Sequence, residues 1–242
     1  MPTGACQLTI IAPVFNEAQS VSHAVALLTA AAASAVGDAY EVLFADDGST
    51  DGTRDVLRGL SVVNPRIRTV GDGNHHGYGA MIRWSIRVAQ GEYVLLTDGD
   101  GQFSCSELAH VWPQRAGVDM ITGYRIDRRE GWHRQFGTAL LRAINRVLFN
   151  LRLRDVDCSF KLARASVFRS CDLRCNGFGI DTEIVLELLH RRAQLREIPV
   201  KHQPRVGDRS KLTSARLLGS MLEFVIVSVK KSFVLPWVRR PR

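Results

Sequence analysis

Tyr93-Val94-Leu95-Leu96-Thr97 leads directly into Asp98-Gly99-Asp100-Gly101-Gln102, and Val42-Leu43-Phe44-Ala45 leads in the same way into Asp46-Asp47-Gly48-Ser49-Thr50-Asp51-Gly52. An apolar run that stops at carboxylates is typical of a buried parallel strand opening into a site at its C-terminal end. Crowded carboxylates repel one another unless a cation or hydrogen-bond donors hold them. Oxygen-rich sites suit Mg²⁺ or Mn²⁺, which usually accompany phosphates. The two stretches therefore predict a site for a metal and a diphosphate.

Strand-like and helix-like segments alternate around these stretches. In the first half we expect strands at 8–13, 41–45, 67–70 and 93–97, and helices at 18–35 (with Ser20 as N-cap), 53–60 and 79–89, the last closed by Gly91. The second half predicts strands at 120–122 and 194–200 and helices at 133–151, 181–190 and 212–229. This order favours an α/β fold with a mainly parallel sheet in one domain.

Charge is distributed unevenly along the 242 residues: the net charge of residues 1–124 is −6 and that of residues 125–242 is +14. The basic half suits a phosphorylated substrate, an anionic membrane surface or nucleic acid, and a solvated basic face is the alternative. No window approaches the roughly 20 apolar residues of a membrane span. The N-terminus lacks the pattern of a secretory signal. The five cysteines lack paired spacing, which predicts reduced thiols in a cytoplasmic protein.

Several catalytic motifs are absent. The chain has no GxxxxGK[ST] loop, no dinucleotide-binding glycine fingerprint and no GxSxG elbow, which disfavours phosphate-loop NTPases, nicotinamide dehydrogenases and α/β-hydrolases. Asp98 and Asp100 lie two apart in an extended segment and so point the same way, with Gln102 continuing that side. Together they could grip one divalent ion that neutralises a leaving diphosphate.

The motifs then reveal a resemblance to a known family. Pro13-Val14-Phe15-Asn16-Glu17, the 46–53 stretch, Asn74-x-x-Gly77-x-Gly79-Ala80 and the 98–102 stretch resemble, in order and spacing, the inverting glycosyltransferases with the GT-A fold. The later segments Gly123-Tyr124-Arg125, 155–162 and Pro204-Arg205 followed by Ser210-Lys211 resemble the polyprenol-phosphate branch, which includes dolichol-phosphate mannosyltransferase. The resemblance implies a GT-A, Rossmann-like sheet flanked by helices in a domain over 1–211. A basic, amphipathic helical extension would occupy 212–242.

The resemblance also implies roles for individual residues. Those lining the nucleotide-sugar pocket would be Pro13, Phe15, Glu17, Asp47, Asp98, Gly99 and Arg125. Asp47 would accept a hydrogen bond from the base, and Gly99 would let the backbone approach the ligand. The Mg²⁺ or Mn²⁺ ligands would be Asp98, Asp100 and Gln102. The residues binding phosphates of donor or acceptor would be Arg125, Arg134, Arg205, Ser210 and Lys211.

Two acidic positions would act in catalysis, Asp100 through the metal and Asp155 by orienting an arginine or the nucleophile. A buried ion pair with Arg125 or Arg154 is an equal interpretation of Asp155. Asp157 is expected to face solvent or cap a turn. His75 and His76 are interpreted as polar loop residues, either of which could instead face the donor. The Asp181 carboxylate is favourable at a helix start.

The implied reaction is metal-dependent and inverting. A mannose- or glucose-type sugar would pass from a GDP- or UDP-sugar to a polyprenyl phosphate, whose oxygen attacks the anomeric carbon. A soluble acceptor and a metal-dependent nucleotidyltransferase remain alternatives. Nucleic acid is disfavoured as a partner because no aromatic-rich basic motif is present. We expect the protein on the cytoplasmic face of a membrane, held peripherally by the helices at 133–151 and 212–240 or by a separate membrane anchor protein. Packing of both helices on the sheet is the competing expectation.

Overall fold

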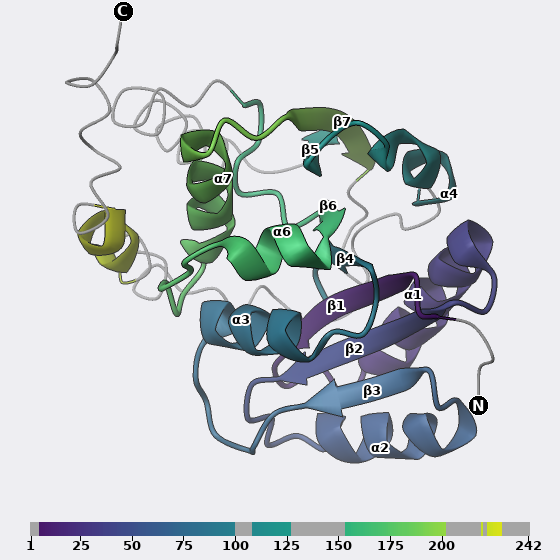
Figure 1. Cartoon of the computed structure of the whole chain (residues 1–242). Helices are drawn as coiled ribbons and strands as arrows, with labels where there is room; N and C mark the ends of the chain where they lie inside the picture. The colour runs from purple at the N-terminus through teal and green to yellow at the C-terminus, as the bar shows by residue number, and fades with distance from the viewer. Residues whose placement is uncertain (1–4, 100–107, 127–152, 202–218, 220–221, 229–242) are drawn as a thin grey trace, which may run out of the picture.

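The computed structural model describes residues 5–99, 108–126, 153–201, 219 and 222–228 (Figure 1). Its strands are β1 (Leu8–Val14), β2 (Tyr40–Asp46), β3 (Ile67–Val70), β4 (Tyr93–Leu96), β5 (Met120–Ile126), β6 (Lys161–Arg164) and β7 (Leu195–Lys201). Its helices are α1 (Val21–Val36), α2 (Thr53–Val63), α3 (Tyr78–Val88), α4 (Leu108–Val111) with the 3₁₀ turn η2 (Trp112–Arg115), α6 (Ala165–Ser170) and α7 (Ile180–His190). Residues 222–228 are also helical.

The strands form one seven-stranded sheet in the order β3-β2-β1-β4-β6-β5-β7 within the described ranges. β1 pairs in parallel with both β2 and β4, and β2 pairs in parallel with β3. β6 runs antiparallel to its neighbours β4 and β5, and β5 pairs in parallel with β7. The carboxyl ends of β1, β2, β4 and β5 therefore lie along one edge of the sheet, where β6 begins.

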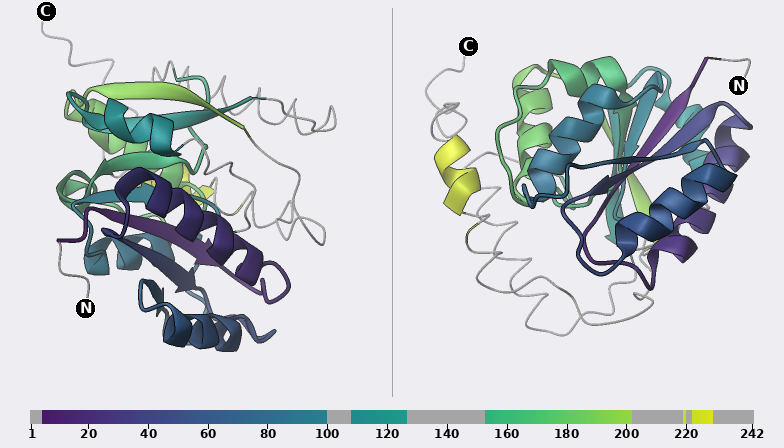
Figure 2. Two further views of the ribbon diagram at one scale, coloured as in Figure 1. Left: turned by 90° about the vertical axis from the view of Figure 1, so that its right-hand side faces the viewer. Right: turned by 90° about the horizontal axis from the view of Figure 1, so that it is seen from below.

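Helices cover both faces of the sheet, which is why the central strands are apolar along their length. α1 and α2 lie on one face, and α3, α6 and α7 lie on the other (Figure 2). Every residue of β2 is buried. The α/β, mainly parallel architecture expected from the sequence is confirmed.

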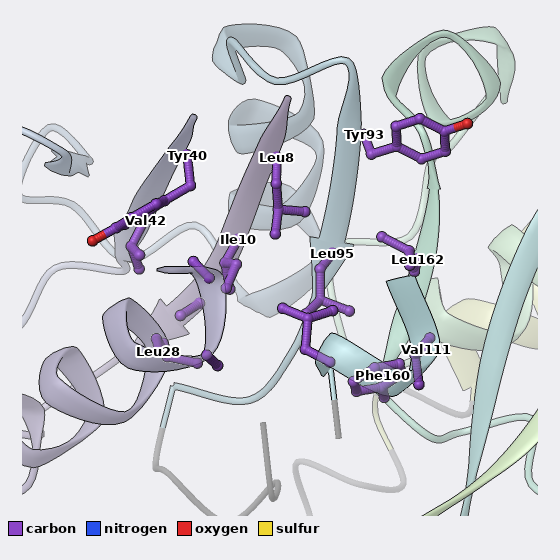
Figure 3. Close-up of a cluster of buried hydrophobic side chains, with 14 of the residues drawn as sticks. Leu8, Ile10, Leu28, Tyr40, Val42, Tyr93, Leu95, Val111, Phe160 and Leu162 are labelled. Atoms are coloured by element: carbon purple, nitrogen blue, oxygen red, sulfur yellow. The ribbon is translucent and has the colours of Figure 1, made fainter. Parts of the chain in front are cut away.

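Each face has its own hydrophobic core. On the α1 face, Leu8 and Ile10 of β1 and Leu95 of β4 belong to one buried cluster with Leu28 of α1 (Figure 3). On the other face, side chains from alternate strand positions pack with α3, α6 and α7; examples are Ile11, Val94, Ile82, Phe168 and Ile184. Alternation of side chains along each strand divides the residues between the two cores.

The expected elements of the first half agree with the structure to within a few residues. The strand expected at 120–122 runs on to Ile126. Gly91 is not a helix cap, because α3 ends at Val88 and its C-cap is Ala89. Instead, a Cβ on Gly91 would lie 2.4 Å from the Thr9 amide nitrogen, so glycine is needed for close packing against β1. β6 and α6 were not expected.

The expected helix 133–151 lies outside the described residues, as does most of 212–229. Within the described 222–228 segment, Phe224 packs against Gly179. A Cβ added to Gly179 would lie 2.6 Å from the Phe224 Cβ. Leu222, Val225 and Ile226 of the same helix are exposed. No helix in the described part of the chain has both the length and the apolar character needed to cross a membrane.

Candidate active site

Residues expected in the nucleotide pocket meet at the carboxyl edge of the sheet. Pro13 lies near the end of β1 and pairs in register with Ala45 of β2. Phe15 follows β1, Asp47 follows β2, and Asp98 lies two residues beyond β4. Because β2, β1 and β4 are adjacent parallel strands, these groups lie side by side, as the general rule for ligand sites in open α/β sheets requires.

The three acidic residues of the 46–52 loop have different tasks. Asp46 is fully buried, accepts from Arg54 Nε at 2.9 Å and from the Ser49 amide at 3.0 Å, and so shapes the loop. Asp51 accepts from Thr53 Oγ1 at 2.5 Å and from the Thr53 amide at 3.1 Å, which holds the first turn of α2. Asp47 is the carboxylate of this group that faces the β3–α3 loop.

The Asp47 carboxylate is buried and accepts bonds from that loop. Oδ1 accepts from the His76 amide at 2.7 Å and from the Gly77 amide at 3.0 Å. Oδ2 accepts from the Gly77 amide at 3.2 Å and lies 2.9 Å from His75 Nδ1. The His75 ring also contacts Phe15, with centroids 5.0 Å apart. Phe15, Asp47 and His75 therefore form one cluster at the mouth of the sheet.

The loop after β1 is fastened to the loop after β2. Asn16 adopts a positive φ of 54°, a conformation that asparagine tolerates. Its amide donates to Ser49 Oγ at 2.9 Å, and the Glu17 amide donates to Thr53 Oγ1 at 2.8 Å. The Glu17 carboxylate accepts from Ser20 Oγ at 2.6 Å, just before α1. The two loops thus form a single wall of the site.

At the end of β4, the Asp98 side chain is partly exposed and Gly99 is buried. A Cβ on Gly99 would lie 2.3 Å from the Pro13 carbonyl oxygen. The absence of a side chain at residue 99 thus permits close approach to the protein's own β1. The resemblance had implied approach to a ligand.

Arg125 near the end of β5 is fixed by Asp155. Its Nε donates to Asp155 Oδ2 at 2.8 Å and its Nη2 to Oδ1 at 3.0 Å, while its amide donates to Oδ2 at 3.3 Å. Burial acts to lower the Arg125 pKa, but the bond and charge of Asp155 outweigh it and raise that pKa above its usual value. Asp155 is therefore paired with Arg125 and not with Arg154, and this pair is also the arrangement by which Asp155 could orient an arginine, so its catalytic role stays a prediction.

Beneath the site lies a second buried ion pair. Lys161, at the start of β6, is fully buried, and its ammonium lies 3.0 Å from Asp181 Oδ1 at the start of α7. Burial is the main cause that raises the pKa of Tyr78 well above its usual value, and the charges of Asp181 and Asp98 add to it. Tyr78 also stacks on Phe178, with ring centroids 5.1 Å apart. Asp181 therefore does more than favour a helix start.

The secondary candidates have local partners. His76 Nε2 lies 3.0 Å from Asp72 Oδ1, on the exposed side of the loop. Asp157 is exposed, in agreement with the solvent-facing interpretation, and it accepts from Thr182 Oγ1 of α7 at 2.7 Å. Glu183 accepts from the Arg174 amide at 2.9 Å, which anchors the loop before α7.

Six expected site residues lie outside the described part of the chain: Asp100, Gln102, Arg134, Arg205, Ser210 and Lys211. Among residues that the structure describes, no group of three or more His, Cys, Asp or Glu side chains could hold a metal. The proposed ligand set includes two residues beyond those ranges, so the metal site stays a prediction.

Sequence reasoning missed two functional candidates, Lys161 and Tyr78. Lysine is usually exposed in folded proteins. The available signal that Lys161 is buried was its place between Phe160 and Leu162 in the Cys158–Leu162 run. His75 was interpreted as a polar loop residue that could also face the donor, but its contact with Asp47 could not be predicted because it depends on the fold of the loop before α3.

Comparison with known proteins gave a family and a fold. The sequence model of "Glycosyl transferase family 2" matches residues 9–171. Undecaprenyl-phosphate 4-deoxy-4-formamido-L-arabinose transferase of Edwardsiella ictaluri (strain 93-146) is 28% identical over 221 residues. That alignment covers 90% of this chain and 66% of the relative, so the chain spans about two thirds of the relative's length.

Two solved structures illustrate the likeness of fold. Mannosyl-3-phosphoglycerate synthase from Rubrobacter xylanophilus superposes with a TM-score of 0.71 at 18% identity, covering 95% of this chain and 76% of that one. Glucosyl-3-phosphoglycerate synthase from Mycobacterium tuberculosis, in complex with Mn²⁺, uridine diphosphate and phosphoglyceric acid, gives 0.68 at 16% identity, with coverages of 95% and 78%. At these identities the likeness concerns the fold alone.

Proposed function

Because this chain belongs to glycosyl transferase family 2, we propose that it moves a single mannose- or glucose-type sugar from a GDP- or UDP-sugar to a polyprenyl phosphate. Its membership in a glycosyltransferase family agrees with the resemblance seen in the sequence motifs. The observation that carries the proposal is the convergence of Asp47, Asp98 and Arg125 at one sheet edge. The name of the Edwardsiella relative, an undecaprenyl-phosphate sugar transferase, supports a lipid phosphate as acceptor.

The nucleoside would bind in the cluster of Phe15, Asp47 and His75. Loop amides and His75 already approach both Asp47 oxygens. A base N–H would therefore share Oδ2 with His75 or displace its ring. The His75 side chain is 55% exposed, so it can move without breaking a core contact.

A divalent cation fits the chemistry of the β4 end. Asp98 offers a partly exposed carboxylate there, and oxygen ligands suit Mg²⁺ or Mn²⁺. Asp98, Asp100 and Gln102 would hold the ion. When bound, it would supply positive charge that neutralises the departing nucleoside diphosphate.

Arg125 would bind the phosphate of donor or acceptor. A guanidinium has five N–H donors, and Asp155 engages two of its nitrogens, so N–H groups remain for a ligand. Fixing the side chain beforehand lowers the entropy lost on binding. A phosphate acceptor is already an anion, so no base must take its proton. In this proposal Asp155 orients Arg125, and the attack inverts the anomeric carbon.

Peripheral contact with a membrane is the last part of the proposal. Leu222, Val225 and Ile226 form an exposed apolar stripe, and the second half of the chain carries a net charge of +14. Exposed apolar side chains and a net positive charge both favour binding to the surface of an anionic bilayer.

One experiment tests the reaction. The protein is incubated with a panel of GDP- and UDP-sugars, a short prenyl phosphate and Mn²⁺, and the lipid fraction is analysed by mass spectrometry. The proposal expects a glycosylated prenyl phosphate and release of a nucleoside diphosphate. Sugar remaining only in water-soluble products would favour a soluble acceptor, and release of pyrophosphate would favour a nucleotidyltransferase.

A further inference from the structure

Lys161 is surrounded by acceptors. The side chain has no exposed surface, and burial of an ammonium is costly unless hydrogen bonds and an opposite charge compensate. Its Nζ donates to the Val156 carbonyl at 3.2 Å, to the Cys158 carbonyl and to Asp181 Oδ1 at 3.0 Å. Three acceptors match the three donors of an ammonium group, so this site is specific for lysine.

Two of these acceptors belong to the turn that carries Asp155. Lys161 binds the carbonyls one and three residues after Asp155, and Asp155 in turn fixes Arg125 with two side-chain bonds. In the sheet Lys161 pairs with Leu96 of β4 on one side and with Thr122 of β5 on the other. It therefore lies between the strand that leads to Asp98 and the strand that carries Arg125.

The charge of Asp181 also acts on the start of α3, which follows the loop that binds Asp47. The charge of Asp181 helps to raise the pKa of Tyr78, the first residue of α3. The residue before it, Gly77, donates its amide to both oxygens of Asp47. Hydrogen bonds thus join the buried pair to Arg125 through the 155–158 turn, and Asp181 acts on Tyr78 next to the Asp47-binding Gly77 through its charge.

We propose that the Lys161–Asp181 pair is a positioning element that holds Arg125 in place at the sheet edge, through the 155–158 turn. This inference rests on the proposed function for its catalytic consequence. A small displacement of a charge-binding group affects the transition state more than the bound substrate, because the charge on the leaving group develops during reaction.

The first test separates positioning from stability. Lys161→Met removes the ammonium and leaves Asp181 unpaired, whereas the double variant Lys161→Met/Asp181→Asn removes the uncompensated charge as well. We expect the double variant to recover thermal stability, while kcat stays about 100-fold below wild type and the donor KM changes less than about threefold. Recovery of kcat together with stability would overturn the inference.

A matched control lies at the other end of the sheet. Glu41, at the start of β2, is a buried carboxylate that accepts from Thr9 Oγ1 and the Gln90 amide, both at 2.6 Å, and from Arg68 Nη1 at 2.5 Å. Glu41→Gln should destabilise the fold without lowering kcat. A kcat loss equal to that of Lys161→Met would mean that lost stability alone explains the effect.

The second test does not depend on sugar transfer. The Arg125 Nε–H signal in a ¹⁵N NMR spectrum, assigned by its loss in Arg125→Lys, reports the bond to Asp155. Its hydrogen exchange should accelerate at least tenfold in the double variant and remain slow in Glu41→Gln. Unchanged exchange in the double variant would refute the inference. Absence of transfer by the wild-type protein would refute the proposed function and leave this second test decisive for the inference.

Discussion

Replacing Asp155 by asparagine should destabilise the protein more than any exposed acidic substitution nearby. Asp155 is 4% exposed and receives three N–H groups from Arg125 at 2.8, 3.0 and 3.3 Å. The side-chain amide of the introduced asparagine would turn a donor toward a donor and leave the guanidinium without its counter-charge. Removing one partner of a buried ion pair costs about 3–5 kcal/mol. Because the Arg125 side chain is 20% exposed, water compensates part of this loss, and we expect about 2–4 kcal/mol.

The assay is urea and thermal unfolding at neutral pH, with Asp157→Asn as the control. At roughly 2–4 °C per kcal/mol for a protein of this size, Asp155→Asn should lower Tm by about 5–15 °C. Asp157 is exposed and accepts one bond, from Thr182, so its variant should lose no more than about 1 kcal/mol. Equal losses in the two variants would refute the assignment of Asp155 as the buried anchor of Arg125.

Three further outcomes are expected. Gly99→Ala should lower the free energy of unfolding in urea by about 1–3 kcal/mol, because its Cβ would lie 2.3 Å from a β1 carbonyl oxygen. Gly59→Ala is the control: no atom lies within 4 Å of the added Cβ, so this variant should stabilise α2. Burial raises the pKa of the Cys158 thiol to about 12, so mass spectrometry should find it unalkylated by iodoacetamide at pH 8 until the protein unfolds. Hydrogen bonds led by that from the Asn74 amide lower the Asp72 pKa to about 2. The hydrogen bonds to ionised Asp72 therefore stabilise the fold fully above the unfolded-state pKa of about 3.9, and this stabilisation is lost as pH falls through about 2. NMR titration should give an Asp72 midpoint of about 2. A midpoint above 3 would show that this loop is not formed in solution.

The sequence was most informative where one physical rule dominated. The strand over 67–70 matches β3 residue for residue, because three of its four residues are β-branched and turn-forming residues lie on both sides, Asn64-Pro65 before it and Gly71-Asp72-Gly73 after it. β6 was missed since its four residues begin and end with charged side chains. Those charges fit a strand only because Lys161 finds buried acceptors, which depend on contacts distant in sequence.

The candidate site was likewise only partly predictable from the sequence. The acidic stretches after β2 and β4 predicted where a site would lie, because parallel strands bring their carboxyl ends together. The sequence did not reveal which carboxylates serve the fold. Asp46 pairs with Arg54, an arrangement set by the α2 start, and Asp155 pairs with Arg125 across 30 residues. Pairings of this kind depend on tertiary geometry that local patterns do not encode.

Calorimetric titration of UDP and GDP, with and without Mn²⁺, tests the central claim most directly. One of the two nucleotides should bind the wild-type protein at least tenfold more tightly with the metal. Asp98→Asn should abolish that gain, while Asp157→Asn should retain it. Binding of both nucleotides with the same affinity in the presence and absence of Mn²⁺, or a full metal-dependent gain in Asp98→Asn, would contradict the account.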